Sequence, residues 1–189
     1  MPTDPEVVRY QNEIERLMGL LIGADIPIQT EWRSEFGNGI YSPRVDIAVG
    51  PFATTEGERL IEQYDRMYGT YHELVNNLID IHRQNTQEET SREEIYYRTM
   101  IINPNARCFM AIEVEKSGSR KHLMGDAVNA TALGRIGIVV GWTPEMFRAF
   151  LNLKRYFDYL GSVGKNTFNL GNLLIVDRNQ LIEAILRVL

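Results

Sequence analysis

The most chemically suggestive side chains in the sequence are three carboxylates on stretches that otherwise have the composition of buried strands. Glu113 and Glu115 stand two residues apart within 108–115, and Asp46 stands within 44–52. Residues i and i+2 of a strand share a face, so the two glutamates project together. Neighbouring carboxylates repel and raise each other's pKa unless a cation lies between them. Three converging acids would form a hard-oxygen site of the kind that Mg²⁺ prefers.

A metal ion held by these acids could carry out phosphodiester cleavage, because it can activate a water molecule and stabilise the leaving oxygen. The same spacing allows a simpler alternative. In that alternative Glu113 and Glu115 line a solvated strand face, and Asp46 belongs to a turn. Spacing alone does not separate the two interpretations.

A basic run, 116–122, follows the two glutamates directly. Ser119, or Ser117, has the residue type of a helix N-cap, which would put Arg120 and Lys121 in the first helical turn. Cations are unfavourable there, since the N-terminus of a helix is already positive. The arrangement becomes favourable if the turn faces an anion, where free N–H groups and cations act together. The alternative is that both cations point into solvent.

Composition and charge describe an ordinary globular chain. The 189 residues, 44% hydrophobic and 24% charged, fit one domain with a sizeable core. The single cysteine excludes an internal disulfide framework, and no Cys/His cluster has zinc spacing. The net charge of −5 disfavours a protein that coats nucleic acid, yet it allows an enzyme with a local basic cleft.

The N-terminal stretch is charged and has no apolar core of the kind found in signal peptides. The most apolar early stretch, 17–28, is shorter than the roughly 20 residues of a membrane span. We therefore expect a soluble, cytoplasmic protein without membrane contact.

The periodicity of apolar residues predicts an α/β chain with a central mixed sheet, because strands and helices alternate in the second half and imply parallel pairing. A turn with Asn-Gly at its centre is expected at 36–43, and 95–107 is ambiguous between helix and strand. A helix is expected to close at Gly134 in a left-handed conformation, and another to begin at Thr143 and end at Gly161. The predicted helices cover 5–22, 56–84, 117–134, 143–161 and 178–189, and the predicted strands lie at 44–52, 108–115, 135–142 and 172–177. The stretch 23–33 is expected to break the first helix and to begin a further strand.

A long helical insertion, at about 56–102, must leave the sheet and return to a neighbouring strand. Its residues Tyr64, Tyr68 and Tyr71 recur at helical spacing. On an exposed face they would suit a homodimer contact through 56–85. The alternative is that the tyrosines pack against their own domain.

PRVDIAV, followed later by FMAIEVEK, a helix and a buried strand, resembles the PD-(D/E)xK nuclease superfamily, whose fold is restriction-endonuclease-like. The family pattern is an Asp at the start of one central strand, then (D/E)-x-K on the next strand, then a helix. Asp46 matches the first acid and Glu113 the second. Glu115 stands where the family usually has lysine, a departure with precedent in that superfamily. The resemblance covers about 5–25 and 40–140, and it implies a single nuclease-like domain over the whole chain.

The resemblance implies an endonuclease dependent on Mg²⁺ (or Mn²⁺) that acts on nucleic acid, with DNA favoured. Asp46, Glu113 and Glu115 would bind the metal, and Glu115 could instead orient the attacking water. Lys121, on the following helix, could reach back in place of the usual lysine. The further candidate phosphate contacts are Lys116, Arg120 and His122.

Two other function classes stay open. One is a catalytically inactive nuclease-fold module that acts through protein partners. It would explain both the missing lysine and the negative net charge. Metal binding by the three acids would be evidence against it. A small-molecule phosphate binder using the 117–122 turn ranks last, since the sequence has no glycine-rich loop of the P-loop type.

Overall fold

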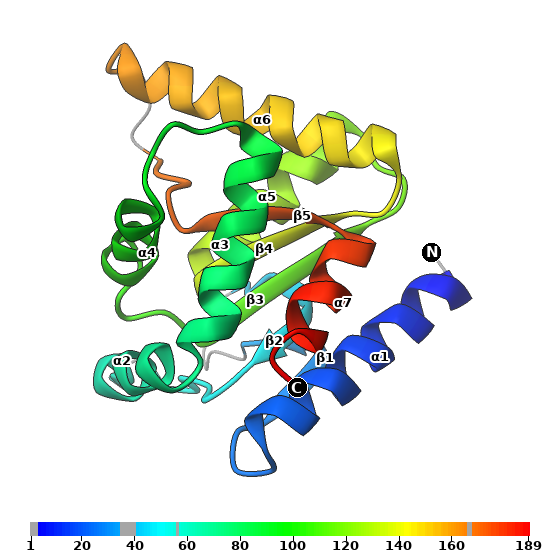
Figure 1. The fold of residues 1–189 in the computed structure, drawn as a ribbon, viewed down its shortest axis with the longest axis vertical. Helices are drawn as coiled ribbons and strands as arrows, with labels where there is room; N and C mark the ends of the chain where they lie inside the picture. Colours follow the sequence, from blue (N-terminus) through cyan, green and yellow to red (C-terminus); the bar gives the residue numbers. More distant parts are fainter. Residues whose placement is uncertain (1–3, 35–40, 56, 166–167) are drawn as a thin grey trace.

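The computed structural model describes residues 4–34, 41–55, 57–165 and 168–189 (Figure 1). Most of the turn predicted at 36–43 therefore lies outside the described residues. The strands are β1 (Ile28–Arg33), β2 (Arg44–Val49), β3 (Cys108–Glu115), β4 (Gly134–Gly141) and β5 (Leu173–Asp177). The helices are α1 (Pro5–Ile22), α2 (Ile61–Thr70), α3 (His72–Thr86), α4 (Arg92–Ile101), α5 (Arg120–Leu133), α6 (Pro144–Ser162) and α7 (Arg178–Leu186).

The strands form one mixed sheet in the order β1–β2–β3–β4–β5. The pairs β1–β2 and β2–β3 are antiparallel, whereas β3–β4 and β4–β5 are parallel. Parallel neighbours need a crossover connection, and α5 and α6 provide the two crossovers. The predicted α/β chain with a mixed central sheet is thus confirmed.

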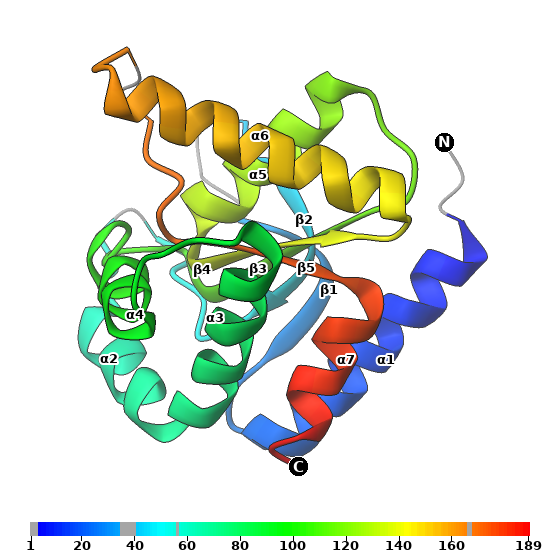
Figure 2. The same cartoon turned by 45° about the horizontal axis from the view of Figure 1, so that its top comes forward.

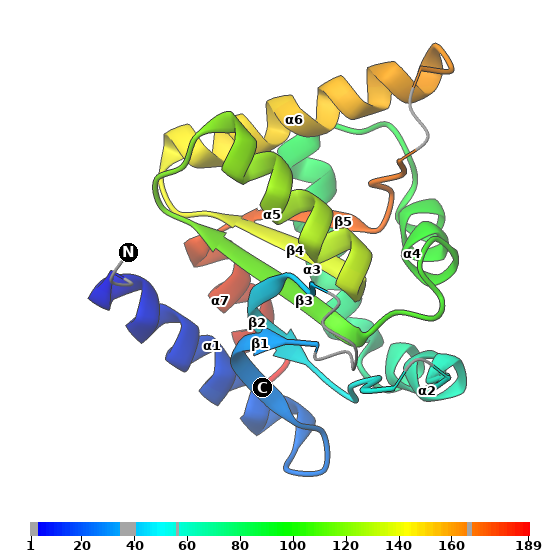
Figure 3. The same cartoon turned by 180° about the vertical axis from the view of Figure 1, so that it is seen from behind.

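Helices cover both faces of this sheet (Figures 1 and 3). Helices α1, α3 and α7 pack with Ile112 and Val114 of β3 on one face, and α5 and α6 pack with Val139 of β4 on the other. Every position of β4 is buried, as expected for a strand covered on both sides. Among the described helices, none combines the length and apolar character needed to cross a membrane.

The helical insertion consists of α2, α3 and α4, and it joins two strands that pair with each other. The prediction of one continuous helix over 56–84 is wrong, because the helix divides at Tyr71. Gly69 and Thr70, just before the break, have low helix propensity. The Tyr71 hydroxyl donates to the carbonyl of the last residue of α1 at 3.1 Å, which fixes the break against the core. The first part of the ambiguous stretch 95–107 is helical in α4.

Two of the tyrosines that were candidates for a dimer contact face inward. Tyr64 and Tyr68 are 0% and 1% exposed, and both rings pack on Phe109 of β3. The Tyr64 hydroxyl also donates to the backbone carbonyl of Ala106 at 3.2 Å. These two side chains therefore pack in their own domain and are not available to a second copy. A homodimer through 56–85 stays a prediction.

Helix ends were predicted with mixed success. Thr143 is the N-cap of α6, since its hydroxyl accepts the Met146 N–H at 3.2 Å. The prediction of a left-handed helix end at Gly134 is wrong, because this residue has φ −88° and begins β4. Helix α6 also continues one residue beyond Gly161.

Gly137 of β4 lets α5 approach the sheet closely. A Cβ at this position would lie 2.8 Å from the carbonyl carbon of Ala130 in α5, closer than real Cβ atoms come. We expect Gly137→Ala to lower the free energy of unfolding by about 1–3 kcal/mol, because the added methyl forces the two backbones apart. Chemical denaturation measures the change.

Gly125→Ala is the matched control for that experiment. Gly125 lies in α5, and a Cβ there meets nothing within 4 Å. Alanine should raise the free energy of unfolding by about 0.5–1 kcal/mol, since glycine weakens a helix interior. Equal effects of the two substitutions would contradict the assigned contact.

Candidate active site

The acids of the sequence motif lie where β2 and β3 stop pairing. The strand ladder runs as far as Ile47 opposite Ile112. Beyond that point side chains take over from the ladder: the Val114 N–H donates to Asp46 Oδ2 at 2.7 Å, and the Asp46 N–H donates to Glu113 Oε2 at 3.3 Å. Meanwhile β3 stays paired with β4 to its last residue. The two strands thus form a fork that contains the carboxyl groups of Asp46 and Glu113.

Helix α5 brings two further polar groups to this fork. The Asn129 amide donates to Glu113 Oε1 at 3.4 Å, and the Asp126 carboxyl group shares a hydrogen bond with that of Glu115. Asp126 and Asn129 are three residues apart and therefore share a helix face. We call Asp46, Glu113, Glu115 and Asp126 the acidic cluster.

Asp126 was absent from the residues predicted to form the site. The available signal was its position directly before Ala127, which is fully buried on the sheet-facing side of α5. An acid at the border of an apolar helix face resembles an ordinary surface residue. Its role becomes visible only when the crossover places α5 over β3.

The turn after β3 holds Glu115 in place. Its Oε1 accepts the Ser117 N–H at 2.8 Å. Gly118 presses against the same carboxylate, since a Cβ on Gly118 would lie 2.7 Å from Glu115 Oε2. A side chain at position 118 would therefore displace Glu115.

Burial is the main reason why the pKa values of Asp46, Glu113 and Asp126 are raised. It raises the pKa of Asp46 to about 6, and the negative charges of Glu31 and Glu115 add to the shift. Burial raises the pKa of Glu113 well above its usual range, with Asp46 and Asp126 adding. For Asp126, burial and the neighbouring Glu115 raise the pKa to about 8. Among the described residues, no lysine, arginine or histidine forms an ion pair with any acid of the cluster.

The donor chemistry of the cluster fits a hard divalent cation, because all four groups are carboxylates. In the conformation described, however, no three acidic, histidine or cysteine side chains of the described residues are arranged to hold a metal ion. The carboxylates instead accept backbone and amide N–H groups. The two hydrogen bonds to Glu113 are long, at 3.3 and 3.4 Å. Glu113 would therefore lose only weak hydrogen bonds if its carboxylate turned toward a cation.

Lys116 follows Glu115 directly but bonds residues outside the acidic cluster. Its Nζ bonds Asp4 Oδ2 at 2.8 Å and Glu6 Oε2 at 2.6 Å, at the N-terminus of α1. The same ammonium lies 5.5 Å from the ring centroid of Trp142. The structure thus joins this lysine to α1 and not to the neighbouring acids.

Arg120, Lys121 and His122 form the first turn of α5, and all three are exposed. None of them forms a hydrogen bond or ion pair with another residue in the described part of the chain. Ser119 is the N-cap residue, but its side chain makes no capping hydrogen bond. The cations point into solvent, as in the simpler alternative, and are free to contact an anion.

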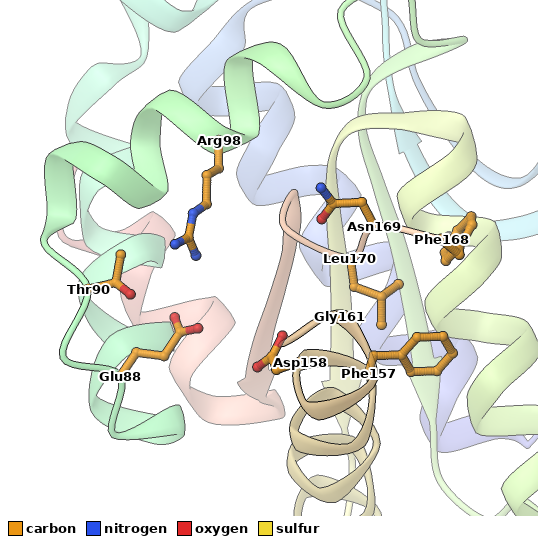
Figure 4. A pocket seen from close by; sticks show the side chains of 9 residues that line it. All are labelled: Glu88, Thr90, Arg98, Phe157, Asp158, Gly161, Phe168, Asn169 and Leu170. Atoms are coloured by element: carbon orange, nitrogen blue, oxygen red, sulfur yellow. The ribbon is translucent and has the colours of Figure 1, made fainter. Parts of the chain in front are cut away.

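A second group of charged residues lines a pocket of about 530 Å³ at the C-terminal end of α6 (Figure 4). Lys154, 5% exposed, bonds Glu88 Oε1 at 2.7 Å and Asp158 Oδ2 at 2.8 Å. Buried His82 accepts the backbone N–H of Ile175 and lies 3.6 Å from Glu88. The neighbouring His82 and Lys154 lower the pKa of Glu88 to about 2. Because each charged group has a partner, we interpret this cluster as structural.

We expect Lys154→Ala to lower the free energy of unfolding by about 2–3 kcal/mol, because two carboxylates lose their buried cation. Lys165→Ala, at an exposed position of the same region, is the control and should change it by less than about 0.5 kcal/mol. Denaturant titration compares the two variants. Equal changes would mean that the buried ion cluster adds nothing to stability.

The raised pKa values predict that the metal-free protein loses stability as pH rises. A carboxyl group with a raised folded pKa stabilises the folded state below its unfolded pKa, and this stabilisation is lost as pH rises through the folded value. For Asp126 the window runs from 3.8 to about 8. We expect Asp126→Asn in EDTA at pH 8 to melt at least about 2–4 °C above wild type, and the difference to shrink toward pH 4.

Glu62→Gln, which removes an exposed acid of α2, is the control for that melting experiment. It should leave the melting temperature unchanged at both pH values, because exposed carboxylates are screened by water. An Asp126→Asn protein whose advantage does not grow with pH would contradict the assigned burial.

We compared the chain with protein-family models, with curated proteins and with solved structures, and none of them matches it. The acidic cluster and its surroundings are therefore the features of the molecule that indicate a function.

Proposed function

We propose that this chain is a metal-dependent nuclease of restriction-endonuclease-like fold, with the acidic cluster as its active centre. The observation that carries the proposal is the fork, in which acids from β2, β3 and α5 meet without a cationic partner among the described residues. The cluster lies toward the carboxyl end of β3. In open α/β sheets, ligands bind outside the carboxyl ends of the parallel strands.

Asp46, Glu113 and Glu115 would hold Mg²⁺ or Mn²⁺, with Asp126 as a fourth carboxylate. The bound ion would supply an activated water and stabilise the leaving oxygen. The chain's own groups orient the acids: a backbone N–H holds Asp46, the Asn129 amide holds Glu113, and Asp126 holds Glu115. Phosphate oxygens would complete the coordination, as is usual for Mg²⁺ sites.

Lys121 is the better of the two candidates for the amine that the motif lacks. Lys116 is held by Asp4 and Glu6 on the other side of the sheet edge. Lys121 lies in the first turn of α5, five residues before Asp126, and its side chain has no partner within the described residues. It is therefore free to contact a phosphate.

A second candidate function is an inactive nuclease-fold module that binds protein partners. The observation that favours it is the conformation of the cluster, in which no metal-binding group is formed within the described residues. Glu115 in the usual lysine position points the same way. Such a module would keep its buried acids protonated and would bind no divalent ion.

Calorimetric titration of Mg²⁺ and Mn²⁺ separates the two candidates. The samples are wild type, the Asp46→Asn/Glu113→Gln variant, and a Glu62→Gln/Glu73→Gln control that removes two exposed acids. Each is then incubated with supercoiled plasmid and with circular single-stranded DNA. We expect the wild type and the control to bind metal and nick DNA, and the Asp46→Asn/Glu113→Gln variant to lose binding and nick at least about a hundredfold more slowly.

A wild-type protein that binds no metal and nicks no DNA at millimolar metal would overturn the nuclease proposal in favour of the binding module. Nicking that survives in the Asp46→Asn/Glu113→Gln variant would exclude the acidic cluster as its source. Loss of nicking in the control as well would indicate a general effect of charge.

A further inference from the structure

Helix α6 crosses over α5 (Figure 2). Residues of both helices line a groove of about 670 Å³. Leu123 of α5 and Met146 of α6 line it and are almost fully buried, at 3% and 8% exposure. Arg120, Arg148 and Tyr156 also line it, and Tyr156 is 55% exposed. The groove thus combines an apolar floor with two guanidinium groups and an accessible aromatic ring.

The lining of this groove has more cations than acids, although the chain as a whole carries −5. Arg120 and Arg148 have no acidic partner in the described part of the chain, and neither has the adjacent Lys121. One acid of the lining, Glu145, offsets part of this charge. A local excess of unpaired cations attracts a polyanion even on an acidic protein. Several arginines elsewhere are ion-paired, among them Arg44, Arg135 and Arg187.

One end of the groove lies beside the acidic cluster. Gly118 lines the groove, and a Cβ on the same residue would lie 2.7 Å from Glu115 Oε2. A polymer in the groove would therefore bring one of its phosphates to the acids. We infer that this groove binds an unpaired strand of nucleic acid and leads it to the acidic cluster. This inference depends on the proposed nuclease function.

An unpaired strand fits the groove better than a duplex does. The bases of an unpaired strand expose faces that can stack on Tyr156 and lie over the apolar floor, while the phosphates reach Arg120 and Arg148. A duplex keeps its bases stacked inside and offers mainly phosphates to such a surface. Met124, 43% exposed, extends the apolar wall in a way that only bases would use.

Fluorescence anisotropy with end-labelled oligothymidylate in EDTA tests this inference, because EDTA prevents cleavage. Arg120→Ala/Arg148→Ala should weaken binding and make the slope of log affinity against log salt shallower by about 1.4, about 0.7 for each lost phosphate contact. Tyr156→Ala should weaken binding at least about fivefold and leave the salt slope unchanged.

The matched controls are Arg9→Ala/Arg66→Ala and Tyr97→Ala, at exposed positions outside the groove. They should bind the oligonucleotide within about twofold of wild type, since they keep the groove intact. Losses in the controls as large as in the groove variants would overturn the inference. So would duplex DNA or polyglutamate that competes as well as unlabelled oligothymidylate.

The two proposals fail in different ways. Asp46→Asn/Glu113→Gln should bind the oligonucleotide in EDTA at least as tightly as wild type, because it keeps Arg120, Arg148 and Tyr156. Groove-dependent binding without any nicking by the wild type would overturn the nuclease function alone. Normal binding and nicking in all groove variants would overturn the groove alone.

Discussion

The burial of closely spaced carboxyl groups in the fork between β2 and β3 is the constraint on which the site depends. Burial and neighbouring charge raise the pKa values of Asp46, Glu113 and Asp126, so these groups keep protons that exposed acids release. Hydrogen bonds from Val114 and Asn129 offset only part of this imbalance. The cluster therefore attracts positive charge, and protons and divalent cations would compete for the same oxygen atoms.

The sheet remains hydrogen-bonded on both sides of the fork that holds these acids. Each strand of the fork keeps its other neighbour: β2 stays paired with β1, and β3 with β4, past the point where they separate. Helix α5 packs over the opening, and the close backbone contact at Gly137 sets the distance between α5 and the sheet. Three elements thus fix four acids, and the backbone supplies most of the groups that orient them.

The sequence was most informative where the pattern of apolar residues reports burial directly. The strands of Asp46 and Glu113 were predictable, because an acid in an apolar strand stands out. Asp126 was not, since its orientation depends on how the crossover helix packs and not on any local pattern. The break at Tyr71 was also hidden, because helical spacing continues through it and the cause is a hydrogen bond to a distant helix.

The contacts of Lys116 make the two sides of the sheet edge different. It joins the start of α1 through Asp4 and Glu6, and the ring of Trp142 lies 5.5 Å from its ammonium and 4.9 Å from the guanidinium of Arg178. These contacts fill the α1–α7 side of the edge with alternating cations and aromatic surface. In the proposed groove over α5 and α6, a polymer would have this side of the edge on one flank only, so the two orders in which its ends could pass the acids would not be equivalent. The fold thereby provides a polarity that could distinguish one strand direction from the other.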